Sequence, residues 1–248
     1  MTAAIPGFVP QWTAPAGVRA FVTTREAGHS TGTFARFNLG DHVGDDPDAV
    51  AANRRWLRRG LALPADPAWL NQVHGTHCTE ATASGPREVE ADAAVVRGPG
   101  AVAAVLTADC LPVILARDDA RAAAVAHAGW RGLAGGVLEA ALTALGPVPV
   151  HAFLGPAIGP AAFEVGPEVR AAFLEADPGA DAAFAAQGGK WRADLYRLAR
   201  RRLMQQGLPA ARISGGDFCT FDEAERFYSH RREAPTGRMA TLVWLGPG

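Results

Sequence analysis

The sequence predicts an α+β protein that folds as a single domain over residues 1–248. Hydrophobic residues make up 48% and charged residues 20% of the chain, a balance typical of a soluble globular protein with a sizeable core. Strand-type runs gather between residues 93 and 127, and helical patterns mixed with single strands follow them. This order favours α+β over a regular βαβ alternation, and no internal repeat or Ser/Gly linker divides the chain.

A helix over residues 47–59 is the first long element that the sequence predicts. Asp46 supplies an N-cap, Pro47 stands at the first helical position, and Gly60 follows the end. Short apolar runs then predict strands at residues 93–96, 102–106, 112–116 and 122–127. Turns of a few residues separate these runs, so we expect hairpins within one largely antiparallel or mixed sheet.

The apolar period changes to that of a helix after Gly132. Pro167 opens a later helix, and Asp194 caps a third one that ends at Gly207. We therefore predict helices over residues 133–145, 167–176 and 195–206, and a closing strand over residues 239–245.

The overall charge and the cysteine count exclude several classes of partner. The chain has 24 basic and 25 acidic side chains, a formal net charge of −1, and hence no electrostatic footprint for nucleic acid or an anionic membrane. No apolar stretch approaches the ~20 residues that span a bilayer, and the N-terminus lacks signal-peptide features. Three scattered cysteines are too few for a disulfide framework. We therefore expect a cytoplasmic protein with free thiols, and a monomer, although the sequence leaves the oligomeric state open.

Reactive side chains stand at the ends of three predicted elements. His74 lies in a polar segment, Cys110 in a break between two apolar strands, and His127 before a glycine-flanked turn. Imidazole and thiolate are the preferred ligands of Zn²⁺, and three ligands with one open position are the arrangement of catalytic zinc. A lone cysteine is more often a small buried hydrophobe, however, and a histidine before glycine is more often a turn residue. Spacing alone therefore leaves the metal site open, with His77 and Cys78 as rival ligands.

Arginines and nearby polar residues form a second candidate site. Lys190 is the only lysine and lies outside any Schiff-base or P-loop motif, so a bound phosphate has to be held mainly by arginine. A guanidinium fork binds two oxygens of a phosphate or carboxylate at once. The ordinary alternative is that Arg231 and Arg232 are a solvated surface pair. The candidates for binding substrate are Arg25, Asn38, Arg131, Ser229, Arg232 and Arg238.

Sequence strings spread over almost the whole chain carry a resemblance to a known family. Two of them are highly specific, namely Ala108-Asp109-Cys110-Leu111-Pro112 and His127-Ala128-Gly129-Trp130-Arg131-Gly132. Others follow the family's order: Thr23-Thr24-Arg25, Asn38-Leu39-Gly40, Gly44-Asp45-Asp46-Pro47, Gln72-Val73-His74-Gly75, Leu154-Gly155-Pro156-Ala157-Ile158-Gly159-Pro160, Cys219-Thr220, Ser229-His230-Arg231-Arg232 and Thr236-Gly237-Arg238. In these residues the sequence resembles the multicopper polyphenol oxidase, or laccase-domain, family.

The resemblance implies a layered α/β/β/α fold with mixed sheets, similar to toxin cysteine hydrolases. It implies purine nucleoside phosphorylase activity on adenosine, inosine, guanosine and methylthioadenosine, together with adenosine deaminase activity. It also implies that His74, Cys110 and His127 bind zinc. Arginines would then hold phosphate beneath ribose C1′, and water activated by zinc would attack C6 of adenine. Asp109 would support the metal or shuttle a proton, unless it only caps a strand end.

Two positions depart from the family pattern, and other classes of function stay open. Glu26 and Ala27 precede Gly28 where a glycine pair is usual, and His230 replaces a tyrosine, which we expect to alter how substrate is held. Copper-dependent phenol oxidation is disfavoured, because three clustered ligands cannot supply several copper centres. A cysteine amide hydrolase that edits peptidoglycan precursors is another class, with Cys110 as nucleophile and His127 as base. A binding module without activity is the last.

Overall fold

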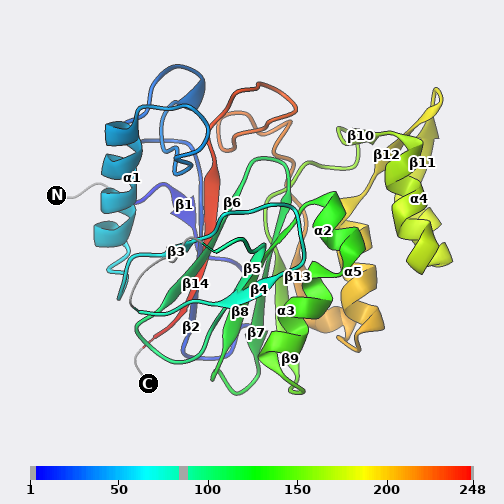
Figure 1. Ribbon diagram of the computed structural model, residues 1–248, viewed down its shortest axis with the longest axis horizontal. Coiled ribbons are helices and arrows are strands. Elements are labelled where there is room, and N and C mark those ends of the chain that lie inside the picture. Colours follow the sequence, from blue (N-terminus) through cyan, green and yellow to red (C-terminus); the bar gives the residue numbers. More distant parts are fainter. Residues whose placement is uncertain (1–3, 84–88, 247–248) are drawn as a thin grey trace.

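Two β-sheets packed face to face form the centre of the molecule, and helices cover both outer faces (Figure 1). The computed structural model describes residues 4–83 and 89–246. Within these residues, no helix is both long enough and apolar enough to cross a bilayer.

The first sheet has five strands in the order β1-β2-β14-β6-β3. All neighbours are antiparallel except β3 and β6, which are parallel. The strand closest to the C-terminus therefore lies in the middle of this sheet. The strands are β1 (Gly7–Phe8), β2 (Val18–Thr23), β14 (Met239–Leu245), β6 (Val102–Thr107) and β3 (Ala68–Trp69).

The second sheet has six strands in the order β13-β9-β7-β8-β5-β4. Its four inner strands pair antiparallel, and the edge strands β13 and β4 each join in parallel, so the sheet is mixed. The strands are β13 (Ile213–Gly215), β9 (Val150–Leu154), β7 (Leu111–Arg117), β8 (Ala123–Ala128), β5 (Ala93–Val96) and β4 (Cys78–Glu80).

Side chains of the central strands alternate between two faces, and this alternation separates the core into layers. In β6, Ala103 and Val105 pack between the sheets, whereas Ala104 and Leu106 pack under the helix on the outer face. The layer between the sheets also receives Val125 of β8. Thr107 and His127 lie two residues beyond Val105 and Val125 on the same strands. Their side chains therefore point to the same side, at the end of this inner layer.

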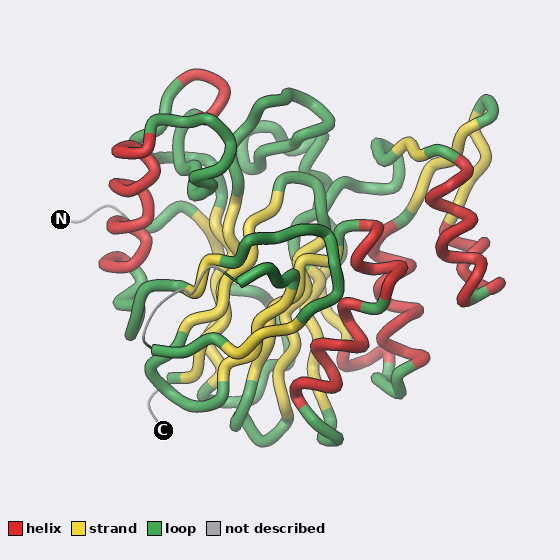
Figure 2. Tube along the Cα trace, in the orientation of Figure 1, coloured by secondary structure: helices red, strands yellow, loops and turns green. Residues whose placement is uncertain are grey.

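The helices divide between the two outer faces (Figure 2). Helix α1 (Pro47–Gly60) buries Leu57 against the five-stranded sheet, and the helices α2, α3 and α5 cover the six-stranded sheet. A three-stranded sheet, in the order β10-β12-β11, extends from the body together with α4. The bounds are α2 (Trp130–Gly135), α3 (Val137–Leu145), α4 (Pro167–Ala176), α5 (Leu195–Gln205), β10 (Glu164–Val165), β11 (Phe184–Gln187) and β12 (Lys190–Ala193), with short 3₁₀ helices at Gly32–Phe34, Pro178–Ala183 and Ala210–Arg212.

The predicted fold class is confirmed, since the layers run helix, sheet, sheet, helix and both central sheets are mixed. The helix predicted over residues 47–59 begins with the Asp46 cap, whose side chain accepts a hydrogen bond from the backbone N–H of Asp48, and it extends one residue further to include Gly60. The helix over residues 167–176 and the strand over residues 239–245 have their predicted bounds.

Two local predictions were wrong. The four strands between residues 93 and 127 do not share one sheet, because β6 belongs to the five-stranded sheet and only β7 and β8 form a hairpin within the other. The helix predicted over residues 133–145 is two helices, α2 and α3. Gly136 separates them with a φ of 103°, a left-handed conformation that glycine adopts at little cost and that ends the first helix.

Candidate metal centre

The chain crosses from one sheet to the other at one end of the inner core layer. Strand β6 ends at Thr107 and β7 begins at Leu111 in the opposite sheet. Between them Asp109 has a φ of 86°, in the left-handed region, where a non-glycine residue costs about 1–3 kcal/mol. This strained crossing holds Cys110 at the same end of the sheets as His127, which lies near the end of β8.

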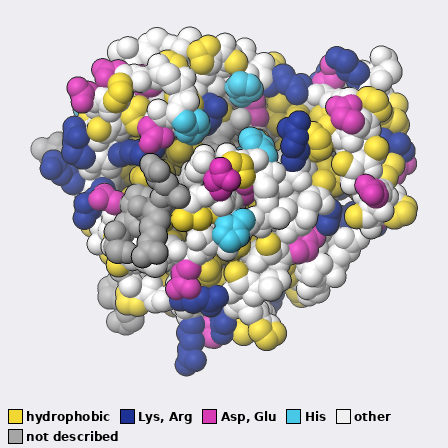
Figure 3. Space-filling model, in the orientation of Figure 1, with side chains coloured by type: hydrophobic (Ala, Val, Ile, Leu, Met, Phe, Trp, Pro, Cys, Tyr) yellow, Lys and Arg dark blue, Asp and Glu magenta, His cyan; other side chains and the backbone are white. Residues whose placement is uncertain are grey.

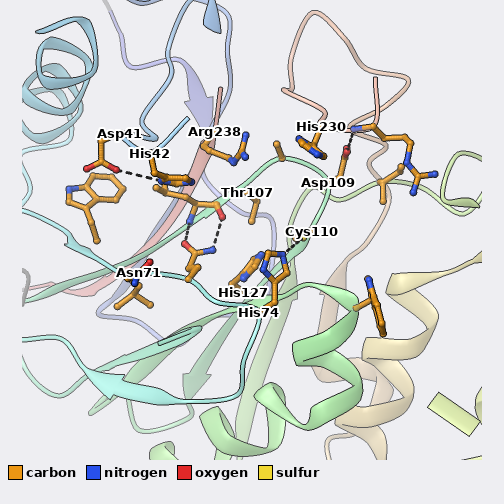
Figure 4. Close-up of a pocket in the computed structure, with 18 of the residues that line it drawn as sticks. Asp41, His42, Asn71, His74, Thr107, Asp109, Cys110, His127, His230 and Arg238 are labelled. Atoms are coloured by element: carbon orange, nitrogen blue, oxygen red, sulfur yellow. Dashed lines mark hydrogen bonds and ion pairs between the residues drawn. The ribbon is translucent and has the colours of Figure 1, made fainter. Parts of the chain in front are cut away.

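Three side chains converge at this end. The candidate ligand atoms of His74, Cys110 and His127 all lie within 4.8 Å of one another. The Sγ of Cys110 is 3.7 Å from Nε2 of His74, and the two imidazole rings meet edge to face with centroids 4.8 Å apart. Figure 4 shows the three side chains pointing toward one another from separate segments. We call them the His–Cys–His group.

A buried carboxylate orients the group from behind. Asp92, which is fully buried, accepts a hydrogen bond of 2.8 Å from Nδ1 of His127. It also accepts from the backbone N–H groups of Val73, His74 and Gly75, at 3.2, 3.0 and 2.6 Å. One carboxylate therefore fixes the His127 ring and the loop that carries His74. Because Nδ1 of His127 is used in this way, its Nε2 is left to act as a ligand.

Glycines allow the loops to approach this closely. A Cβ atom at Gly129 would lie 2.9 Å from Cδ2 of His74 and 3.1 Å from Sγ of Cys110. A Cβ at Gly132 would lie 2.7 Å from the carbonyl oxygen of Gly75. The glycines of the His127–Gly132 string therefore form the floor against which the group packs.

The charges of the group stabilise one another. Burial raises the pKa of the Cys110 thiol, but the adjacent His127 and His74 outweigh burial and lower it from 9.0 to about 6. Burial lowers the pKa of His127, but the Cys110 thiolate and Asp92 outweigh it and raise it to about 9. Without a metal, the pair is therefore a thiolate next to an imidazolium at neutral pH. A metal cation takes the place of the proton in such a pair.

The distances and donor atoms of the group fit a zinc-type ion. With Zn–S near 2.3 Å and Zn–N near 2.0 Å, tetrahedral geometry places nitrogen and sulfur ligands about 3.5 Å apart, close to the 3.7 Å between His74 and Cys110. The three side chains would hold such an ion, and water or substrate would complete its coordination.

The rival ligands lie elsewhere. Cys78 packs in β4 against the outer core, where burial raises the pKa of its thiol to about 11 although Arg97 opposes the rise. His77 is exposed and contributes its backbone carbonyl, which accepts from the N–H groups of Asp92 and Ala93. Neither belongs to the group of three that the described residues form.

The His–Cys–His group opens into a cavity of about 640 Å³. Figure 3 shows histidine side chains gathered near the middle of this face of the molecule. Both polar and apolar side chains line the cavity. Besides the group itself, the lining comprises Asp41, His42, Arg54, Trp69, Leu70, Asn71, Gln72, Leu106, Thr107, Ala108, Asp109, Trp130, Ile158, Phe163, His230, Arg231 and Arg238.

Asp109 ties the rim of this cavity together. Its Oδ1 accepts a hydrogen bond of 2.6 Å from the hydroxyl of Thr220, and its Oδ2 accepts one of 2.7 Å from the backbone N–H of Arg231. Both carboxylate oxygens are therefore engaged by loops distant in sequence. Asp109 therefore holds these two loops of the rim in position next to Cys110.

Arg238 is the one member of the predicted arginine set that lines the cavity. Its Nη1 donates to the carbonyl oxygens of Thr236 and Gly237, at 2.8 and 3.1 Å. Its Nε and Nη2 make no hydrogen bond to the described residues. Burial lowers the pKa of Arg238, opposed by the charges of Cys110 and Asp109, so its guanidinium lies near both.

The other predicted binding residues lie behind the wall. Arg232 donates to the carbonyl oxygens of Thr220, Phe221 and Phe227, and Ser229 is fully buried and accepts from the N–H of Arg232. Three more do not line the cavity either: Arg25 bonds to Ala35 and Glu233, Arg131 stacks on Trp130, and the buried Asn38 bonds to Gly40, Asp45 and Arg238.

Sequence reasoning did not single out Asp92 or the Asp41–His42 side of the cavity. Asp92 was detectable as an acid between two alanines directly before a buried strand, a position that requires a partner. Arg231, which we weighed only as half of a surface pair, lines the cavity. Of the two departures from the family pattern, His230 lines the cavity and Ala27 does not.

Together, a layered α/β/β/α fold and an open His–Cys–His cavity at the end of its sheets define a candidate metalloenzyme of α+β class. The chain belongs to the family described as multi-copper polyphenol oxidoreductase laccase, whose model matches residues 19–246. The resemblance drawn from the sequence strings is therefore confirmed.

Relatives of known name cover nearly the whole chain. The purine nucleoside phosphorylase YfiH of Escherichia coli is 48% identical over 239 residues, which are 96% of this chain and 98% of that protein. The purine nucleoside phosphorylase PA4543 of Pseudomonas aeruginosa is 52% identical over 241 residues, covering 95% and 97% of the two chains.

Solved structures show the same fold. The crystal structure of Neisseria meningitidis protein NMB0706 superposes with a TM-score of 0.92 at 45% identity, covering 97% of this chain and 99% of that one. That of YlmD from Geobacillus stearothermophilus gives a TM-score of 0.88 at 30% identity, covering 98% and 100%.

Proposed function

We propose that this protein is a zinc-dependent purine nucleoside phosphorylase that accepts adenosine, inosine, guanosine and methylthioadenosine. The observation that carries the proposal is one cavity that joins the His–Cys–His group to the free edge of Arg238. Such a cavity can hold a nucleoside and an anion side by side. The names of relatives that match over nearly the whole chain support the same activity.

Phosphorolysis requires an anion beneath ribose C1′. The C1′–N9 bond breaks, a phosphate oxygen bonds to C1′, and the purine leaves after N9 takes up a proton. Arg238 suits the anion, because its Nε and Nη2 edge is free and can grip two oxygens. Arg231 supports the anion from the rim, since among the described residues its guanidinium makes a hydrogen bond only through Nη1, to the carbonyl oxygen of Glu164. Holding the reactants in line is the main contribution of such a site.

The metal would be held by His74, Cys110 and His127, with Asp92 fixing the His127 ring. When bound, it supplies a Lewis acid that polarises an oxygen of substrate or water. The names within the family differ, since the family description refers to copper oxidation. Zinc fits this donor set better, because the described residues form a single group of three ligands and several copper centres need more.

Adenosine deamination is the second reaction that we propose for this cavity. Replacement of the 6-amino group requires water and a group that moves protons, and the cavity places His230 and Asp109 near Cys110 (Figure 4). Both oxygens of Asp109 accept hydrogen bonds, so His230 is the better candidate for moving a proton.

A cysteine amide hydrolase is the alternative that a specific observation favours. Cys110, His127 and Asp92 stand as nucleophile, base and orienting acid, and the lowered pKa of Cys110 makes it a thiolate at neutral pH. A metal on Cys110 would occupy the nucleophile, so bound metal and amidase activity exclude each other.

Product analysis tests the proposal. Metal-defined protein is incubated with adenosine, with and without phosphate. We expect adenine and ribose 1-phosphate only with phosphate, and slow formation of inosine without it. Release of adenine in the absence of phosphate would identify a nucleoside hydrolase instead. Absence of both products from the zinc-loaded protein, with turnover of amide substrates by the metal-free protein, would establish the amidase.

Replacing Cys110 with alanine tests the shared site. We expect Cys110→Ala to lose most bound zinc and both activities, a reduction of more than about 100-fold, because a direct ligand matters more than the outer partners that cost about 10–100-fold. The fold should persist, since the cores do not depend on this side chain. Retention of a full zinc equivalent, measured by metal analysis, would remove Cys110 from the ligand set.

A further inference from the structure

The cavity has two chemically different ends, with the His–Cys–His group between them and nearer to one. Figure 4 shows Asp109 and His230 at the end that includes Cys110, Asp41 and His42 at the other end, and Asn71 apart from them but on the same side. Arg231 lies at the first end beside Asp109, whereas Arg238 lies between the two ends, with its side chain against Gly40. The second end differs in two respects: the state of its cation, Arg54, and the free side-chain amide of Asn71.

The cation at the second end is already neutralised. Arg54 uses Nε and Nη2 on the carbonyl oxygen of Leu39, and its Nη1 lies 3.1 Å from Oδ2 of Asp41. The guanidinium also lies over the Trp69 ring, 4.4 Å from its centroid. No edge of Arg54 is left for an anion. With Trp69 and Leu106 as apolar wall, this end suits a flat, neutral, hydrogen-bonding group.

Asn71 presents an unused amide at this end. Its backbone is fixed on both sides, because its N–H donates to Val89 and its carbonyl oxygen accepts from Ala91, each at 3.2 Å. The side-chain amide of the neighbouring Gln72 is already engaged, because it donates to the carbonyl oxygen of Leu106 and accepts from the N–H of the same residue. The Asn71 side chain, in contrast, makes no hydrogen bond to the described residues. A rigid backbone therefore carries a free donor and a free acceptor into the cavity.

An amide of this kind matches the edge of a purine. Asparagine can donate and accept at once, and it pairs in two contacts with an adenine edge. Turned over, the same amide donates to O6 of a 6-oxopurine and accepts from its N1–H. The polar atoms at this end are therefore complementary to both 6-amino and 6-oxo bases.

Resting on the phosphorylase function above, we propose that Asn71 hydrogen-bonds the C6 edge of the purine during phosphorolysis and determines which bases are accepted. The base then lies at the Asp41–His42 end, and ribose C1′ faces Arg238. Deamination at C6 by the His–Cys–His group would require the nucleoside to bind the other way round.

Substitution of Asn71 tests this proposal. Asn71→Asp keeps the shape of the side chain but removes the donor and places oxygen against O6. We expect kcat/KM to fall about tenfold or more for both inosine and adenosine, because the lost N–H donor serves O6 of one base and a ring nitrogen of the other. Asn71→Leu should lower both by about tenfold. Thermal stability and zinc content should not change, because the side chain has no hydrogen-bond partner among the described residues.

Gln206→Glu is the matched control. It makes the same amide-to-acid change on the surface, outside the lining of this cavity, and should leave both rates as in the unchanged protein. Wild-type kcat/KM values for both inosine and adenosine in both Asn71 variants would overturn the base contact and leave the phosphorylase intact. If the unchanged protein cleaves no purine nucleoside with phosphate, the proposed function fails, and the base contact fails with it.

Discussion

The His–Cys–His group and the arginine-bearing segment at residues 229–238 were both predicted as functional, but the fold uses them differently. The three members of the group converge on one point of the cavity. In the segment, Arg231 and Arg238 line the cavity, whereas Arg232 donates hydrogen bonds to three backbone carbonyl groups behind it. Imidazole and thiolate clusters have few structural uses, whereas a guanidinium serves equally well as ligand or as brace. A long cationic side chain is therefore weaker evidence of function than a reactive short one.

The largest contrast that we predict is between two cysteines. In metal-free protein, iodoacetamide at pH 7 should modify Cys110 faster than Cys78 by a factor on the order of 100. The reason is the pKa, about 6 for Cys110 and about 11 for Cys78. The Cys110 rate should rise with pH through about 6 and then level off, and Cys78 should react only at strongly alkaline pH. Peptide mapping by mass spectrometry measures both rates.

Zinc should abolish this contrast, because it occupies the Cys110 sulfur. Equal labelling of the two cysteines in metal-free protein would contradict the charge pairing described for Cys110 and His127. Full labelling of Cys110 in zinc-loaded protein would instead contradict its role as a ligand.

The buried carboxylate behind the group gives the next largest effect. Asp92→Asn should weaken zinc binding about 10–100-fold, as loss of an outer partner does. It should also destabilise the fold by about 1–3 kcal/mol, because an amide nitrogen in place of Oδ2 cannot accept from the N–H groups of Val73 and Gly75. Chelator competition and urea unfolding measure the two quantities. Zinc affinity equal to that of Asp119→Asn, a surface control, would show that Asp92 does not act on the metal.

The smallest predicted effect distinguishes the roles of Arg238 and Arg232. Arg238→Lys should raise KM for phosphate about tenfold, because lysine cannot offer the two-pronged edge. Arg232→Lys should leave that KM unchanged but lower the stability by about 1–3 kcal/mol, through lost bonds to carbonyl oxygens. The reverse pattern, in steady-state kinetics and thermal unfolding, would exchange their roles.

The predictable part of this fold was the part that local patterns determine. The cap at Asp46 and the short apolar runs of β5 to β8 depend on neighbours in sequence, and these elements were found. Sheet membership was not predictable in the same way. The strained residue Asp109 lets β6 and β7 belong to different sheets although three residues separate them, and nothing in the apolar pattern distinguishes this crossing from a hairpin.

The same distinction between local pattern and folded arrangement applies to the candidate site. The residues of the His–Cys–His group were accessible because specific strings surround them, but their order in space was not. Asp92 was missed, because its role exists only where the loop of His74 folds over β5. The positions of Arg232 and Arg238 relative to the cavity depend on which carbonyl groups lie nearby, and this is a property of the folded chain.

The floor of the cavity has a consequence for attempts to redesign the protein. Because the Cβ of an alanine at Gly129 would lie 2.9 Å from the His74 ring, the pocket cannot gain even one carbon atom on that side without moving a ligand. New specificity therefore has to be engineered from the opposite wall. There, His42 and Asn71 can be exchanged without disturbing the packing of the sheets, because neither side chain is buried.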